Sequence, residues 1–181
     1  TFAAALSSRA AVFNVKGEFD RAICDCDEAI RISPKLAGAY YNRGAAYLGK
    51  GDFDEAIEDN TTAIQLRPDL VEAFNNRASA HASLGHLDDA IADYAEAIRI
   101  DPDDAESYYN RGSVFLNQGD LTGALSDCDR AVELNPRFAI AYALRGSVLA
   151  RSGEIDKAIT DYTKAIRLEP RLVEAYCNRA N

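Results

Sequence analysis

The sequence predicts an all-α solenoid, a stack of antiparallel helix pairs, and two observations carry this prediction. The segment Ala39–Gly44 returns in near-copies that begin at Ala73, Ser107, Ala141 and Ala175, at a constant interval. The same shift superimposes all five prolines and one glycine in each repeat. These residues are Pro34, Pro68, Pro102, Pro136 and Pro170, and Gly17, Gly51, Gly85, Gly119 and Gly153. A period of about 34 residues is typical of helical repeat proteins, in which each unit packs only on its neighbours.

The repeat register divides the whole chain. Residues 1–2 end one repeat, residues 3–36, 37–70, 71–104, 105–138 and 139–172 form five complete repeats, and residues 173–181 begin a sixth. We expect one continuous solenoid domain over residues 1–181, because stacked repeats share one extended core. The chain has no Met and starts and stops inside a repeat. We therefore expect a fragment, in which a targeting signal would not be seen.

Each repeat predicts two helices in the same order, as residues 37–70 illustrate. The first helix carries Tyr40, Tyr47 and Leu48 at helical spacing and ends before Gly51, which suits a left-handed residue. The second helix is expected to begin at an Asp54 cap and to end before Pro68, because proline cannot continue a helix. The equivalent expected caps are Asp20, Asp88, Thr122 and Asp156.

Small side chains explain how the two helices of a pair approach. Gly44 and Ala78 on first helices are matched by Ala56 and Ala90 on second helices. A close contact between two helix backbones needs small residues at the crossing. The sequence therefore places the tightest contact inside each pair.

Composition limits the class of partner. The chain is 48% hydrophobic and 27% charged, as in folded proteins, and no apolar run is long enough to span a membrane. A net charge of -9 works against nucleic-acid binding, which needs a clustered basic surface. Neutral or basic protein partners are the expectation.

The four cysteines are read as reduced thiols, as in a reducing cytoplasm. Cys26 and Cys128 occupy the same column three repeats apart, which is too distant for a disulfide. Because no second Cys-x-x-Cys or His pair accompanies them, we expect no metal site and no cofactor.

The pattern resembles the tetratricopeptide repeat family over essentially the whole chain. The matching columns are Tyr40, Gly44, Gly51, Ala56, Asn60, Ala63 and Pro68. Asn60 departs by replacing an aromatic residue, which Tyr94 and Tyr162 keep. The resemblance implies a right-handed superhelix of antiparallel helix pairs, with the first helices lining a concave groove.

One column departs from the family in every repeat, because arginine stands where the family usually has an aliphatic residue. In the complete repeats an aspartate follows each of these arginines at a constant spacing. We expect a ladder of ion pairs that joins the helices of each pair, since the guanidinium fork suits a carboxylate. The proposed pairs are Arg43 with Asp59, Arg77 with Asp93, Arg111 with Asp127, and Arg145 with Asp161. The alternative is that the arginines bind carboxylates of a ligand.

The neighbouring column holds Asn42, Asn76, Asn110 and Asn178. In some members of the family, similarly placed asparagines hold an extended peptide backbone, so the resemblance nominates these four as peptide contacts. An amide offers both a donor and an acceptor to a peptide bond. The open alternative is that these asparagines satisfy local backbone groups or water.

Other groove positions follow from helical spacing on the first helices. They are Tyr41, Asn75, Tyr109, Ser79 and Ser113. We expect Tyr41 and Tyr109 to be exposed, where tyrosine gives a large contact area at low entropic cost.

The function predicted from these features is a non-catalytic scaffold that binds a peptide segment of a partner protein. His81 and His86 have no nucleophile at a motif spacing, and no glycine-rich phosphate loop occurs. Two alternatives remain open. One is self-assembly through apolar stacking faces around Phe2, Leu6 and Tyr176. The other is that the chain recruits substrates for a larger enzyme.

Overall fold

The computed structural model describes residues 1–172, and this part of the chain is entirely helical apart from its turns. The chain divides into two compact units, of which the first comprises Thr1–Ile100 and the second begins at Asp101. The first unit contains α1 (Phe2–Val15), α2 (Phe19–Ile32), α3 (Ala37–Lys50), α4 (Phe53–Leu66), α5 (Val71–Ser83) and α6 (Leu87–Ile100). The second contains α7 (Ala105–Gln118), α8 (Leu121–Leu134), α9 (Ala139–Arg151) and α10 (Ile155–Leu168).

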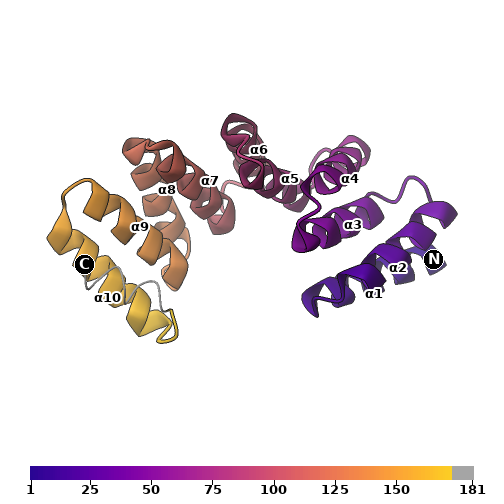
Figure 1. Cartoon of the computed structure of the whole chain (residues 1–181), viewed down its shortest axis with the longest axis horizontal. Helices are drawn as coiled ribbons and strands as arrows, with labels where there is room; N and C mark the ends of the chain where they lie inside the picture. The colour runs from indigo at the N-terminus through magenta and orange to yellow at the C-terminus, as the bar shows by residue number, and fades with distance from the viewer. Residues whose placement is uncertain (173–181) are drawn as a thin grey trace. The chain divides into compact units, whose positions relative to one another are not determined.

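Consecutive helices pack as antiparallel pairs within each unit, as Figure 1 shows. In the first unit α1 pairs with α2, α3 with α4, and α5 with α6. In the second unit α7 pairs with α8, and α9 with α10. First helices also contact one another inside a unit, α1 with α3, α3 with α5, and α7 with α9. The predicted all-α architecture of helix pairs is therefore confirmed.

The turn inside each pair is built around one glycine with a positive φ. The φ angle of Gly51 is +85°, and the equivalent glycines have φ between 73° and 83°. After Gly51 the chain folds back, so that the Asp52 N–H donates to the Tyr47 carbonyl at 3.0 Å. A side chain is strained in this left-handed conformation, which is why the position holds glycine. The predicted role of these glycines is confirmed.

The expected caps of the second helices were placed two residues too late. α4 begins at Phe53, with Asp52 at its N-cap, and Asp54 lies in the first turn. In α8 the cap is Asp120, whose side chain accepts a hydrogen bond from the Gly123 N–H. The glycine turn delivers the chain into the next helix within two residues, so the residue after it becomes the cap. Asp54 instead offers its negative charge to the positive N-terminal end of the helix.

Small residues line the crossing inside each pair, as the sequence predicts. Ala56 and Ala90 have no exposed surface. A Cβ atom added to Gly44 would lie 2.5 Å from Asn60 Nδ2, and one added to Gly146 would lie 2.8 Å from Tyr162 Cε1. Asn60 is fully buried and donates its amide to the Ala56 carbonyl at 2.7 Å. The amide donor of Asn60 is therefore bonded within α4, whereas its buried Oδ1 has no hydrogen-bond partner among the described residues.

None of the helices among residues 1–172 is long and apolar enough to cross a membrane.

Candidate functional site

The arginine column forms two-pronged ion pairs with the aspartates of the second helices. Arg43 Nε lies 2.7 Å from Asp59 Oδ2, and Arg43 Nη2 lies 2.7 Å from Asp59 Oδ1. The pairs of Arg77 with Asp93, Arg111 with Asp127, and Arg145 with Asp161 repeat this arrangement at 2.6–2.8 Å. Arg9 and Asp25 add a fifth pair in the first repeat. Parallel N–H···O bonds of this kind fix both the distance and the plane of the two groups.

Arg43, Arg77 and Arg145 also use their third guanidinium nitrogen. Arg43 Nη1 donates to Asp27 at 2.5 Å, on the second helix of the preceding repeat, and Arg77 Nη1 donates to Thr61 at 3.0 Å. The guanidinium carbon of Arg43 also lies 5.8 Å from the centre of the Tyr40 ring, within reach of a cation–π interaction. The hydrogen bond with Asp59 raises the pKa of Arg43, which keeps the group charged. A ligand carboxylate would have to displace partners that are already in place.

The asparagine column does not form a uniform row of open side chains. Asn42 is buried, and its amide donates to the carbonyl and the hydroxyl of Ser7 at 2.9 and 3.0 Å. Its own backbone carbonyl accepts from Asn14 Nδ2 at 2.7 Å. Asn42 thus joins α3 to α1, and its donor is not offered to a ligand. Asn178 lies outside the described residues.

Asn76 and Asn110 differ from Asn42, because each of them is only half-buried. Asn76 Nδ2 is buried and has no hydrogen-bond partner among the described residues. A buried donor without a partner costs about 1–3 kcal/mol. Asn76 therefore keeps an amide donor that no described residue uses.

Tyr41 and Tyr109 are half-buried, so the expectation that both are exposed was wrong. Tyr41 packs against the cluster of Ala63, Leu70 and Ala73, which belongs to the following helices. Burial raises the pKa of the Tyr41 phenol, and the charge of nearby Glu72 adds to this effect. Both rings are covered by apolar residues of their own repeat and by one alanine of the next first helix, Ala73 or Ala141.

Tyr109 and Asn110 line a pocket of about 240 Å³ between α7 and α9. The other lining residues are Glu106, Phe138 and Ile140. The Tyr109 and Phe138 rings lie 5.3 Å apart, tilted by 56°, which is a favourable aromatic arrangement. The pocket therefore combines an aromatic wall, an aliphatic side chain, one amide and one carboxylate.

Sequence reasoning named Tyr109 and Asn110 but missed Phe138 and Ile140. Phe138 is the N-cap residue of α9, and Ile140 lies in the first turn of that helix. Spacing within one helix cannot find such neighbours. The usable signal is the repeat itself, because Phe138 and Ile140 stand in the same columns as Asp104 and Glu106, one repeat later.

The other predicted groove residues lie on the same helices, in varied surroundings. The Ser79 hydroxyl lies 2.9 Å from Tyr94 Oη, so it contacts the second helix of its own pair. Asn75 and Ser113 are half-buried, on α5 and α7 respectively. The polar groups of Asn42 and Ser79 are thus used inside the fold, toward α1 and α6 respectively.

The two buried cysteine thiols are unreactive. Cys26 and Cys128 have no exposed surface, and burial raises the pKa of each thiol to about 12. The thiolate is the nucleophile and the metal ligand in cysteine chemistry. Neither residue therefore offers a reactive group at neutral pH.

Helix pairs that recur at a constant interval and pack only on their neighbours define an α-solenoid repeat protein. Two family models match the chain. One, described as TPR repeat, matches residues 11–51, 79–119 and 146–181, and the other, described as tetratricopeptide repeat, matches residues 37–70 and 105–138. The chain belongs to the tetratricopeptide repeat family, whose repeats support a role as a scaffold for protein–protein interaction.

Several solved structures share the fold. YrrB, described as a TPR protein with an unusual peptide-binding site, is 24% identical with a TM-score of 0.75, covering 97% of this chain and 91% of its own. MamA is 25% identical with a TM-score of 0.77, covering 90% of this chain and 95% of its own. TTC0263, a thermophilic TPR protein of Thermus thermophilus, is 20% identical with a TM-score of 0.80, covering 96% of this chain and 97% of its own. No curated protein sequence matches the chain.

Proposed function

We propose that this chain binds a peptide segment of a partner protein at the pocket of Tyr109 and Asn110, and that it carries no catalysis itself. The observation that carries the proposal is the pocket between α7 and α9, where an aromatic pair stands beside an amide and a carboxylate. Its volume of about 240 Å³ suits one side chain of a peptide. The fold supports this role, since the similar protein YrrB is described as having a peptide-binding site.

The chemistry of the pocket favours a neutral or basic peptide. The rings of Tyr109 and Phe138 would pack on an apolar side chain or on the stem of a lysine or arginine. Asn110 can donate to and accept from the peptide backbone without reading its side chains. Glu106 and the net charge of -9 both attract a positive group.

In this proposal the arginine column has a structural role and does not contact the peptide. Each of the four arginines of the predicted ladder already holds an aspartate with two hydrogen bonds, so we assign recognition to the neighbouring positions. Asn42 is left out of the recognition set, because its amide is used inside the first unit. Within the asparagine column, Asn76 and Asn110 remain as the proposed contacts on the described helices.

The test begins with peptides selected from a random display library on the intact chain, followed by affinity measurement by calorimetry. Asn110→Ala should weaken a selected peptide about tenfold, since a lost hydrogen bond in a closed contact costs about 1–2 kcal/mol. Tyr109→Ala should weaken it further by removing half of the aromatic wall. Asn117→Ala is the matched control, because Asn117 is an exposed asparagine on the same helix and does not line the pocket.

The proposed site would be wrong if peptides bind and both Asn110→Ala and Tyr109→Ala leave the affinity unchanged. Adding Asn76→Ala to Asn110→Ala extends the test to the first unit. A further loss would support a second peptide contact at α5.

A second candidate function is self-association. Of the residues expected at its contact surface, Leu6 is buried and Tyr176 lies outside the described residues, whereas Phe2 and other residues of α1 are exposed. Phe2 is 68% exposed, Val12 is 52% exposed and Val15 is 90% exposed. Ala5, Ser8, Val12 and Val15 recur at spacings of three and four, so they share one helix face. Exposed apolar residues gathered on one face mark a surface that gains by being covered.

A further inference from the structure

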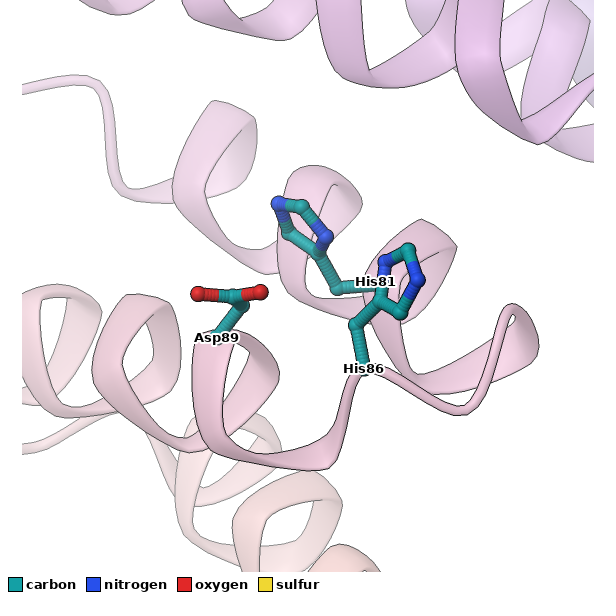
Figure 2. A group of neighbouring side chains, drawn as sticks. All are labelled: His81, His86 and Asp89. Atoms are coloured by element: carbon teal, nitrogen blue, oxygen red, sulfur yellow. The ribbon is translucent and has the colours of Figure 1, made fainter.

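The turn of the third repeat gathers two imidazoles and a carboxylate that the peptide-binding proposal does not use. His81 lies near the end of α5, His86 lies in the turn, and Asp89 lies in the first turn of α6. One ligand atom from each of these side chains lies within 4.8 Å of the others. In the view of Figure 2, the Asp89 carboxylate and the His86 ring flank the His81 ring.

The backbone of the turn fixes the spacing of the two histidines. Gly85 has a φ of +80°, and the His86 N–H donates to the His81 carbonyl at 2.9 Å. Every pair has the same backbone bond, at 2.9–3.0 Å, so this turn is a constant part of the fold. The equivalent bonds join Glu18 to Phe13, Asp52 to Tyr47, Asp120 to Phe115, and Glu154 to Leu149.

Only the third of the five complete repeats carries an imidazole or a carboxylate at all three positions of this turn. The equivalent sets are Phe13, Glu18 and Arg21; Tyr47, Asp52 and Glu55; Phe115, Asp120 and Gly123; and Leu149, Glu154 and Lys157. In three of the other repeats the residue equivalent to His81 packs in an apolar cluster, as Phe13, Phe115 and Leu149 do. A histidine there introduces a polar ring into a position built for an apolar one.

His81 is not satisfied by the surrounding protein. Its Nδ1 atom is buried and has no hydrogen-bond partner among the described residues. Buried polar atoms are usually paired, so an unpaired ring nitrogen beside two further donor side chains calls for a ligand. The ring centres of His81 and His86 lie 5.8 Å apart and their planes are tilted by 47°. The two rings are therefore close together without stacking face to face.

We propose that His81, His86 and Asp89 bind a divalent transition-metal ion of the Zn²⁺ class. Two imidazoles and one carboxylate suit such ions, whereas Mg²⁺ and Ca²⁺ prefer oxygen ligands alone. Ligand atoms around a tetrahedral Zn²⁺ lie roughly 3.4 Å apart. Because His86 and Asp89 are exposed, their side chains have room to turn toward His81. Three protein ligands leave a fourth position for water or for a side chain of a partner.

The ion would join the end of one helix to the start of the next. His81 belongs to α5 and Asp89 to α6, so the ion would clamp the turn of this one helix pair. A ligand that binds the folded state alone stabilises that state by mass action. The expected result is a Zn²⁺-dependent rise in the thermal stability of the chain.

The test is titration of the intact chain with Zn²⁺ in competition with a chelating indicator, with Mg²⁺ and Ca²⁺ as reference ions. We expect one Zn²⁺ per chain at this site. His86→Ala and Asp89→Asn should each weaken Zn²⁺ binding at least about tenfold, as expected for loss of a direct ligand. His81→Phe should do the same and keep the fold, because Phe13 and Phe115 occupy this position in other repeats.

Glu55→Gln is the matched control, since Glu55 is the equivalent of Asp89 in the second repeat, where Tyr47 replaces the histidine. This variant should bind Zn²⁺ like the parent chain. Circular dichroism of each variant without metal separates loss of the site from loss of the fold. Co²⁺ then reports the ligands, because a thiolate charge-transfer band would show that cysteines hold the ion instead.

Besides a thiolate band with Co²⁺, two results would overturn the proposal. One is the absence of Zn²⁺ binding to the folded parent chain. The other is binding that His81→Phe, His86→Ala and Asp89→Asn all leave unchanged.

Discussion

Each arginine of the ladder forms two hydrogen bonds with the aspartate of its own repeat, and this arrangement decides what its substitution does. The side chain of Asp93 is 10% exposed and that of its partner Arg77 is 20% exposed. Removing one member of such a pair leaves the other buried without a counter-charge. The loss of either partner alone is therefore expected to destabilise the fold, because the remaining charge stays buried and uncompensated.

Arg77→Leu should lower the free energy of unfolding by about 3 kcal/mol, because Asp93 is left unpaired. Replacing both members, by Arg77→Leu with Asp93→Leu, should cost less than Arg77→Leu alone, since no buried charge remains. Denaturation by urea, followed by circular dichroism, measures both. Strict additivity of Arg77→Leu and Asp93→Leu would show that the two side chains do not act as a pair.

The repeat register predicted which residues share a column, but it did not predict what each column touches. The constant spacing between Arg43 and Asp59 was informative, because both partners belong to one repeat. Asn42 was harder, since its partner Ser7 lies one repeat earlier on another helix. Part of the surface that covers Tyr41 likewise belongs to another repeat, since Ala73 lies on α5. Contacts between repeats depend on how far each side chain extends toward the neighbouring repeat. The column to which a residue belongs does not give this information.

The histidines illustrate a related limit. On a continuous helix, residues five apart such as His81 and His86 would point in different directions. They meet only because α5 ends at Ser83 and the chain reverses at Gly85. The expectation of no metal site considered Cys-x-x-Cys and histidine pairs, whereas the third member of this cluster comes from the next helix.

At the scale of the element, a small residue at the crossing lets the two helices of a pair approach closely, and in α3 this residue is Gly44. A Cβ atom added to Gly44 would lie 2.5 Å from Asn60 Nδ2, and Asn60 is fully buried on α4. A Cβ atom added to Gly38 would meet only Ser7 Oγ, at an ordinary 3.7 Å. The two glycines lie on the same helix, α3, and differ in what faces them.

Gly44→Ala should destabilise the chain by about 1–2 kcal/mol, because overpacking outweighs the better helix propensity of alanine. Gly38→Ala is the control and should be neutral or stabilising by up to about 1 kcal/mol. Thermal denaturation of the two variants beside the parent chain checks both signs. Equal stability of the two variants would mean that α3 and α4 can separate at this crossing without loss.

Element boundaries were predicted less well than element identity. Pro68 and Gly51 placed the ends of helices correctly, since each imposes a backbone conformation of its own. The prediction chose Asp54 as the cap of α4, whereas the N-cap is Asp52. The two aspartates are two residues apart and offer the same side-chain chemistry, so the sequence did not distinguish them. Which of the two becomes the cap depends on the residue at which the turn ends, and that residue is known only from the folded structure.

At the scale of the whole molecule, two surface properties oppose each other in self-association. The net charge of -9 repels a second copy, whereas the apolar face of α1 gains by being covered. Added salt screens the repulsion and leaves the apolar gain in place, since the screening length falls to about 8 Å at roughly 0.15 M ionic strength. Association through α1 should therefore strengthen as salt rises.

Sedimentation or light scattering over a range of chain concentrations tests this second candidate function. The parent chain should gain mass with concentration, more strongly at roughly 0.5 M than at roughly 0.05 M salt, because the screening length shortens between them. Val12→Ser with Val15→Ser should stay at the mass of one chain, because the exposed face of α1 becomes polar. Ile155→Ser is the control, since Ile155 is an exposed isoleucine on α10 and should leave association unchanged. A parent chain that keeps the mass of one copy at every concentration and salt would remove self-association as a function and leave the pocket of Tyr109 and Asn110 as the proposed interaction surface.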